Sequence, residues 1–183
     1  MRRRGYTIIE IMLVLALIAI MAAMAMPKVS FLRYRQDASG RQVQRTLIGA
    51  QQTAMQKNTN VLFVIDYAAS RMRVVQDTNS NGAADASERW VSWVLPYGST
   101  FAIPSVTADG ATSYYATGPG ISTTSAGPTI TFYPNGSASG DAFLYLGVSS
   151  GRTDALRAIE FTGATGRSRL WRYLNGGWNR DSL

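Results

Sequence analysis

The twelve residues DTNSNGAADASE, positions 77–88, place oxygen-bearing side chains at the intervals of a calcium-binding loop. They fit the pattern D-x-[DN]-x-[DN]-G-x5-E, in which a glycine, here Gly82, makes the sharp turn. The flanking segments RMRVVQ and RWVSWVL favour strands rather than the helices of an EF-hand, so we expect a hairpin connection. Calcium is the cofactor that this loop predicts, although a turn rich in Gly, Asn and Asp also forms without an ion. The candidate ligands are Asp77, Asn79, Asn81, the carbonyl group of Ala83, Asp85 and Glu88.

A second candidate site is the segment GRSRLWRY, residues 166–173. If it is a strand, Arg167, Arg169 and Trp171 share one face, because successive side chains alternate between faces. Arginine and aromatic side chains together can bind phosphates and stack on bases, and Arg172 is a further candidate in the same strand. DNA binding is therefore one hypothesis for this segment. A solvated strand face or a surface for an acidic protein partner is favoured over it.

The composition argues against catalysis. The chain has no histidine and no cysteine, so it lacks the commonest general base and metal ligand and can form no disulfide. The string GVSSG, residues 147–151, has the spacing of a nucleophile motif, but no histidine is available to activate Ser149. We expect neither an enzyme nor a required cofactor.

The candidate sites follow an amino-terminal region of unusual composition. The stretch from Tyr6 to Met26 is almost entirely apolar, with Glu10 its only charged residue, and a helix of this length spans about 30 Å, one bilayer core. Three arginines precede it, which favours a cytoplasmic amino end and an exported remainder of the chain. A removable secretory signal is the competing interpretation, but Pro27 makes AMAMPKV a poor cleavage site.

Helical spacing continues after the apolar stretch. Apolar residues recur at helical intervals, with polar residues around them. We predict a long helix over residues 6–57, with a membrane-spanning part at 6–26 and a bend at Pro27. The apolar stripe of its second half is Val43, Leu47, Ala50 and Ala54.

Residues 58–183 read as a β-rich globular domain. Short runs of β-branched and aromatic residues alternate with Gly, Ser, Asn and Pro, which predicts an antiparallel sheet or sandwich. The fold class is therefore α+β, with the long helix packed on the sheet. Residues 106–128 contain few large aliphatic side chains and read as a long exposed loop. The predicted strands are 61–67, 71–77, 89–95, 129–134, 142–148, 156–162 and 167–173.

The amino-terminal segment RRRGYTIIE, followed by an apolar helix, resembles the type IV prepilin signature. The resemblance implies that a prepilin peptidase removes a cytoplasmic leader, residues 1–5, by cutting between Gly5 and Tyr6, and that the new amino group is methylated. Glu10 and Pro27 occupy positions that match the family. Loss of the leader would leave 15 basic against 11 acidic residues, so net charge is weak evidence for a nucleic-acid partner.

Glu10 needs a partner if it lies within the bilayer. A carboxylate in a membrane helix costs about 2.5–3.5 kcal/mol on insertion scales. The resemblance implies that the amino group of Tyr6 from a neighbouring subunit supplies the opposite charge, which makes Glu10 an assembly residue. A second role is local, because Thr7 and Glu10 form the capping box TIIE.

The carboxyl-terminal part resembles the GspH/FimT branch of minor pilins and pseudopilins. This resemblance implies a structural subunit at or near the tip of a type II secretion pseudopilus or a type IV pilus. Its implied partners are other pilin subunits, the prepilin peptidase and the bacterial inner membrane, with the carboxyl-terminal domain periplasmic or exported. Some members bind DNA through a GRxR element, and Gly166, Arg167 and Arg169 match it.

Overall fold

The computed structural model describes residues 7–25, 31–102, 104, 108, 116–124, 127–148 and 151–180. The chain divides into two compact units, residues 1–30 and residues 31–183, and each is described by itself. Three residues of the prepilin-like signature, Gly5, Tyr6 and Pro27, lie outside the described residues.

The described residues of the first unit, 7–25, contain the helix α1, Ile8–Ala25. Leucine, isoleucine, methionine and alanine make up most of it, and Glu10 is its only charged residue. Its side chains are exposed from Ile8 to Met21, so the helix is apolar on all sides. No helix in the described part of the chain has both the length and the apolar character required of a membrane span.

The second unit begins with α2, Phe31–Lys57. Val43, Leu47, Ala50 and Ala54 are all buried, which confirms the predicted stripe. The predicted helix over 6–57 is thus represented by two helices, and residues 26–30 between them lie outside the described residues. The bend at Pro27 stays a prediction.

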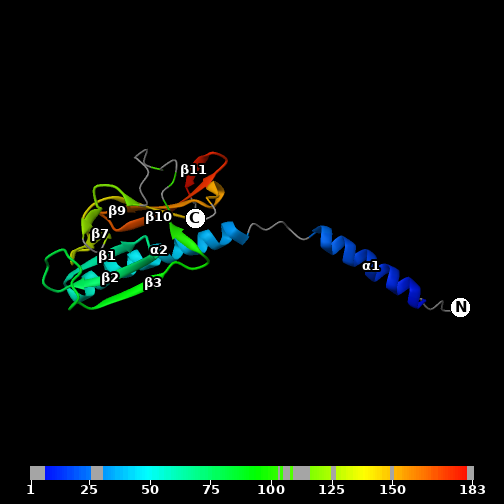
Figure 1. The fold of residues 1–183 in the computed structure, drawn as a ribbon, viewed down its shortest axis with the longest axis horizontal. Coiled ribbons are helices and arrows are strands. Elements are labelled where there is room, and N and C mark those ends of the chain that lie inside the picture. The colour runs from blue at the N-terminus through cyan, green and yellow to red at the C-terminus, as the bar shows by residue number, and fades with distance from the viewer. Residues whose placement is uncertain are drawn as a thin grey trace. The chain divides into compact units, whose positions relative to one another are not determined.

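Two antiparallel sheets follow α2 (Figure 1). The first sheet has the order β3-β2-β1-β7-β6, and the second has the order β11-β10-β9-β8-β4, with β5 also pairing to β8. Helix α2 contacts strands of both sheets, so the predicted α+β fold, with the helix packed on antiparallel sheet, is confirmed. The elements are β1 Asn60–Asp66, β2 Arg71–Asp77, β3 Trp90–Val94, β4 Ser99–Phe101, β5 Ala116–Thr117, β6 Ser122–Thr124, β7 Gly127–Phe132, β8 Ala142–Val148, the 3₁₀ helix η1 Thr153–Ala155, β9 Arg157–Thr162, β10 Arg167–Leu174 and β11 Gly177–Arg180.

All seven predicted strands are present: β2 and β8 have the predicted ends, and the ends of the other five are shifted. The prediction of an exposed loop over 106–128 was wrong in its second half, because β5, β6 and the start of β7 lie there. These short strands are built from Ala, Thr, Ser and Gly and lack the apolar alternation that identifies a strand in sequence. They form by pairing with β7 and β8, which carry the core residues.

One hydrophobic core joins α2 to both sheets. The α2 stripe packs with buried residues of β1, β7, β8, β9 and β10. Phe132 of the first sheet and Phe161 of the second meet edge to face, with ring centroids 5.3 Å apart. Where α2 crosses β10 the helix carries Gly40, and a Cβ atom there would lie 2.6 Å from Leu170 Cδ1. Gly40 therefore permits this close approach.

A buried arginine connects α2 to the second sheet. Arg157, the first residue of β9, is fully buried and its Nε donates a hydrogen bond to Asp37 Oδ1 of α2 at 2.6 Å. Its remaining donors reach the backbone carbonyls of Asp154, Leu156 and Arg33. The guanidinium is thus satisfied by one carboxylate and three carbonyls, as a buried charge requires.

Candidate assembly and binding surfaces

Glu10 lies in the first turn of α1, and its side chain is exposed. Thr7 Oγ1 accepts a hydrogen bond from the Glu10 N–H at 3.3 Å, so the Thr7 half of the predicted capping box is present. No ion pair joins Glu10 to any other described residue. Its carboxylate is therefore placed on an otherwise apolar helix surface, where a partner on another molecule can reach it.

The segment 77–88 connects β2 to β3, which confirms the predicted hairpin. Buried Asp77 organises it, because Oδ1 accepts the N–H of Asn81 at 3.0 Å and Oδ2 accepts the N–H of Gly82 at 2.9 Å. At the other end, Glu88 Oε1 accepts the N–H of Thr78 at 2.8 Å and Oε2 accepts the N–H of Asp85 at 3.2 Å. The two carboxylates close the loop on its own backbone.

The two asparagines of this loop direct their amide groups toward Asp85. The Nδ2 atoms of Asn79 and Asn81 donate to Asp85 Oδ2 at 2.9 Å and 2.8 Å. Their Oδ1 atoms accept backbone N–H groups, of Asn81 and of Ala83 respectively. Calcium coordination would need these oxygens to turn toward an ion. Within the described residues no group of three or more His, Cys, Asp or Glu side chains is arranged to hold a metal ion, and calcium binding stays a prediction.

The arginines of β10 lie on two different faces. Arg167 and Arg169 are exposed and share a face with Trp171. Arg172 lies on the opposite face, where its Nε is 3.2 Å from Asp37 Oδ1 of α2. The structure thus groups two of the three candidate arginines and assigns the third to the contact between helix and sheet.

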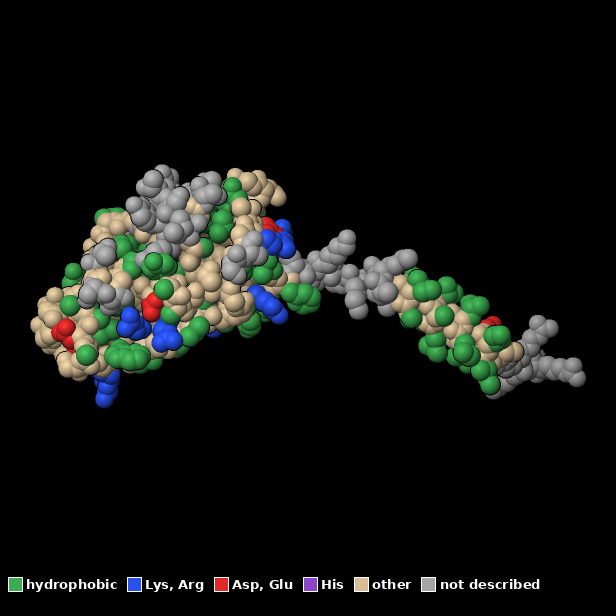
Figure 2. Space-filling view, viewed as in Figure 1, with side chains coloured by type: hydrophobic (Ala, Val, Ile, Leu, Met, Phe, Trp, Pro, Cys, Tyr) green, Lys and Arg blue, Asp and Glu red, His purple; other side chains and the backbone are tan. Residues whose placement is uncertain are grey.

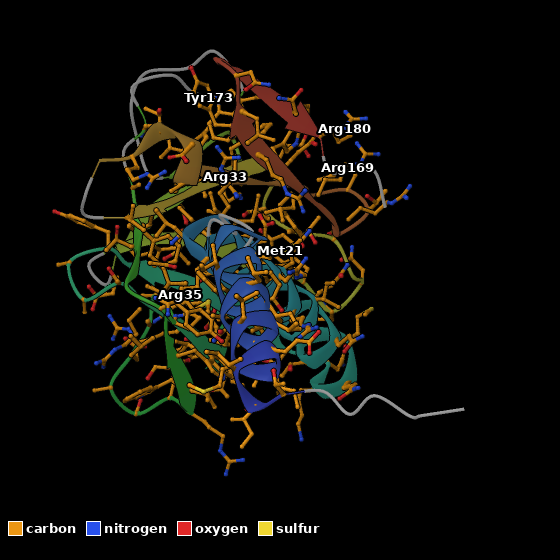
Figure 3. All side chains as sticks on the ribbon, turned by 90° about the vertical axis from the view of Figure 1, so that its right-hand side faces the viewer. Met21, Arg33, Arg35, Arg169, Tyr173 and Arg180 are labelled. Atoms are coloured by element: carbon orange, nitrogen blue, oxygen red, sulfur yellow. The ribbon has the colours of Figure 1, made fainter. Side chains whose placement is uncertain are left out.

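A fourth arginine joins the outer face from β11. Arg180 pairs with Trp171 in the register of the β10–β11 hairpin, and its guanidinium carbon lies 5.0 Å from the indole centroid. Figure 3 shows Arg169 and Arg180 on the same side of this hairpin. The sequence analysis missed Arg180, although the Asn175–Gly176 pair just before β11 is a strong hairpin signal.

One carboxylate reduces the positive charge of this face. Glu160 of β9 accepts a hydrogen bond from Trp171 Nε1 at 3.0 Å, and the same oxygen lies 3.9 Å from an Arg169 guanidinium nitrogen. The face therefore combines exposed arginines with a tryptophan held in a fixed orientation.

Residues 1–26 match the family described as "Prokaryotic N-terminal methylation motif". This match confirms the resemblance of the amino-terminal segment to the type IV prepilin signature. The roles of Gly5, Tyr6 and Glu10 stay predictions. No curated protein matches the sequence.

Several solved structures are similar to the chain, including three of minor pilins or pseudopilins. Two are of the minor pseudopilin EpsH from the type II secretion system of Vibrio cholerae. The first has 13% sequence identity and a TM-score of 0.49, and the match covers 75% of this chain and 97% of the EpsH chain. The second has 12% sequence identity and a TM-score of 0.48, and the match covers 81% of this chain and 94% of the EpsH chain. The third is the type IV minor pilin FimU of Pseudomonas aeruginosa, with 17% identity and TM-score 0.49, covering 75% of this chain and 89% of FimU.

Proposed function

We propose that this chain is a minor pilin or pseudopilin, a non-catalytic subunit that is cut between Gly5 and Tyr6 and assembled into a type II secretion pseudopilus or a type IV pilus. The observation that carries the proposal is the methylation motif over residues 1–26, with Glu10 in the first turn of an exposed apolar helix. Before assembly the inner membrane accommodates this helix, and the unit 31–183 is exported. The subunit acts at or near the tip of the fibre.

The proposed assembly contact is an ion pair between subunits. Cleavage creates a cationic amino group on Tyr6, and Glu10 of the adjacent subunit is the carboxylate that receives it. An unpaired carboxylate among lipid chains is costly, so the pair favours a subunit that enters the fibre next to a processed neighbour. Glu10 thereby selects for processed subunits.

Glu10→Ala tests this proposal. We expect the variant to be cleaved and to stay membrane-bound but to be lost from isolated fibres. Ile11→Ala, at the neighbouring exposed position of the same turn, is the matched control and should assemble normally. Normal incorporation of Glu10→Ala, or recovery of the wild-type protein with residues 1–5 still attached, would contradict the proposal. Immunogold labelling of fibres tests the tip position, which labelling along the whole shaft would exclude.

DNA uptake is the second candidate function, because Arg180 extends the predicted arginine surface across two strands. Arg167, Arg169 and Arg180 can contact phosphates, and Trp171 offers a ring for a base. Each phosphate contact that is removed should lower the salt slope of binding to duplex DNA by about 0.9.

The DNA proposal is tested with the full chain in detergent micelles and a labelled duplex. We expect Arg167→Ala with Arg169→Ala to weaken binding and to flatten its salt dependence, whereas Arg41→Ala, an exposed arginine of α2, should not. Glu160→Gln should strengthen binding, because it removes the negative charge from the same face. If the wild-type protein shows no salt-sensitive binding, this function is excluded, while the assembly proposal is unaffected.

A further inference from the structure

Strand β3 forms an open, apolar edge. It is the outermost strand of the first sheet, and no described strand pairs with its outer side. Natural edge strands are usually protected by charges, prolines or bulges, but WVSWV contains no charged residue. Figure 2 shows hydrophobic side chains along this margin of the larger unit, with Lys or Arg side chains beside them. The exposed fractions are 51% for Trp90, 52% for Val91, 37% for Trp93 and 57% for Val94.

Two hydrogen bonds show which backbone groups of this edge are unpaired. Gln76 N–H donates to the Arg89 carbonyl, and Leu95 N–H donates to the Ser70 carbonyl, both at 2.9 Å. In an antiparallel pair, positions that bond to the neighbouring strand alternate with positions that do not. The odd-numbered residues from 89 to 95 therefore bond to β2.

The even-numbered residues face the other way. Trp90, Ser92 and Val94 direct their N–H and C=O groups away from β2, toward the open edge. An antiparallel strand that binds there must offer outward-facing groups with the same two-residue spacing.

We propose that β3 pairs with β3 of a second copy of this chain, antiparallel and centred on Ser92. In this register each Trp90 lies opposite Val94 of the second copy, and each Val91 lies opposite Trp93. Residues with outward-facing backbone groups then meet one another along the whole strand. Four of the five cross-strand pairs are aromatic with β-branched, a combination that stabilises antiparallel sheets, and the central pair is Ser92 with Ser92.

There is room beside the strand for the incoming side chains. A hollow of about 400 Å³ lies between α2 and the inner face of β2 and β3, and its lining includes Gly49, Thr53, Val74 and Trp93. Nothing lies within 4 Å of the place where a Cβ atom of Gly49 would be. The Val91 and Trp93 side chains of a second copy, which point to this inner face, can therefore enter the hollow.

The charges near the edge favour a weak, salt-dependent contact. Arg71 and Arg73 lie on β2, one strand back from the edge, and neither makes an ion pair with a described residue. In the pair of copies, the two β2 strands are three strand spacings apart, roughly 14 Å. This exceeds the screening length of about 8 Å at physiological salt, so the repulsion is largely screened there and acts mainly at low salt, and pairing should strengthen as salt is raised from low to physiological concentration.

The proposed β3–β3 contact joins only two copies and buries little surface. A two-fold pairing uses the same strand on both copies and does not propagate, so it is separate from fibre assembly through Glu10 and does not rest on the proposed function. A five-residue strand covers much less than the roughly 1,600 Å² of a standard interface, so pairing should depend on protein concentration.

A unique cysteine tests the register, because the chain has none of its own. Ser92→Cys places two thiols opposite each other, about 5.5 Å apart between Cα atoms, within the range of a disulfide. We expect the full chain in detergent micelles to form a disulfide dimer on mild oxidation. Ser87→Cys, exposed in the adjoining loop, is the control and should stay monomeric, because the two copies of residue 87 lie far apart in this register.

Ser92→Pro tests the pairing by a second route. It removes a backbone N–H that points away from β2, so the fold should be retained, while the paired edge is lost. We expect sedimentation to show a concentration-dependent dimer of the wild-type chain that strengthens with salt and is lost in Ser92→Pro. Equal crosslinking of Ser92→Cys and Ser87→Cys, or a wild-type monomer at all concentrations and salts, would overturn the proposal. A dimer that weakens with salt would also overturn it, because it would show that opposite charges hold the two copies together.

Discussion

The Arg157 guanidinium on β9 lies 2.6 Å from the Asp37 carboxylate on α2, and the arginine side chain is only 1% exposed. The same Asp37 oxygen lies 3.2 Å from Arg172 Nε on β10. One carboxylate of the helix thus compensates two arginines of the sheet. Because a buried charge is costly without its counter-ion, this contact controls how α2 is held on the second sheet.

Asp37→Ala should strongly destabilise the protein. Removing the carboxylate leaves Arg157 buried without its counter-ion, and the expected loss is about 3–5 kcal/mol of unfolding free energy. Urea unfolding followed by circular dichroism measures it. Asp37→Ala combined with Arg157→Met should recover much of the loss, and equal stability of the single and double variants would contradict this account.

Asp154 should make stability depend on pH. Hydrogen bonds from Arg152, and from Arg33 of α2, hold the pKa of the Asp154 carboxyl below its ordinary value, although partial burial acts in the opposite direction. Its contribution is therefore present above the ordinary carboxyl pKa of about 3.9 and disappears as the pH falls through the lower folded-state value. The melting temperature of Asp154→Asn should lie below that of the wild type at pH 6, and the two should converge at more acidic pH. A constant difference between pH 6 and pH 2 would argue against this assignment.

Asp77→Ala should loosen the hairpin between β2 and β3 even without calcium. It removes the acceptor for two backbone N–H groups at a fully buried position, and the expected loss is about 1–3 kcal/mol. Hydrogen exchange at Asn81 and Gly82 should speed up. Asp85→Ala is the comparison, because Asp85 Oδ2 accepts amide N–H groups of exposed asparagines, and it should cost less.

Calcium should raise the melting temperature of the full chain if residues 77–88 bind it. Preferential binding to the folded state stabilises it. Because Asn79 and Asn81 must turn their amide oxygens toward the ion, we expect an effect only at millimolar calcium. Asp85→Ala should abolish it, and magnesium should not replace calcium. The absence of a shift in the wild type at millimolar calcium would end this hypothesis.

Two glycines of α2 should respond in opposite ways to alanine. Gly49→Ala should stabilise the protein by about 1 kcal/mol, because alanine favours helix and its Cβ meets nothing within 4 Å. Gly40→Ala should destabilise it by up to about 2 kcal/mol, because buried Leu170 must move aside. Thermal unfolding of the two variants provides the comparison, and stabilisation by both would show that Leu170 shifts without cost.

Much of the fold was predictable because it follows local periodicity. The α2 stripe and the long strands each bury a regular set of apolar residues, which a sequence displays directly. Strands β4, β5, β6 and β11 were missed because they have only two to four residues, too few to show an alternation. Their pairing with longer neighbours determines them, and pairing is a property of the whole fold.

The candidate sites show the same difference between features set by local spacing and features set by the whole fold. The 77–88 hairpin and the shared face of Arg167 and Arg169 follow from spacing within one segment. The partner of Arg172 is on a distant helix, and Asp37 and Arg157 are 120 positions apart in the chain, so no local pattern could join them. Burial of an arginine is also contrary to its usual preference for the surface, so only the folded structure reveals that Arg157 is internal.

Because α2 lies against both sheets, it also determines how the second unit would carry mechanical force. A subunit held in a fibre by its amino-terminal helix is pulled at the start of α2, and the tension would reach both sheets through that one helix. The contacts of Arg33 with Asp154 and of Asp37 with Arg157 lie close to this end, and they would be the first side-chain contacts between α2 and the rest of the unit to carry that load.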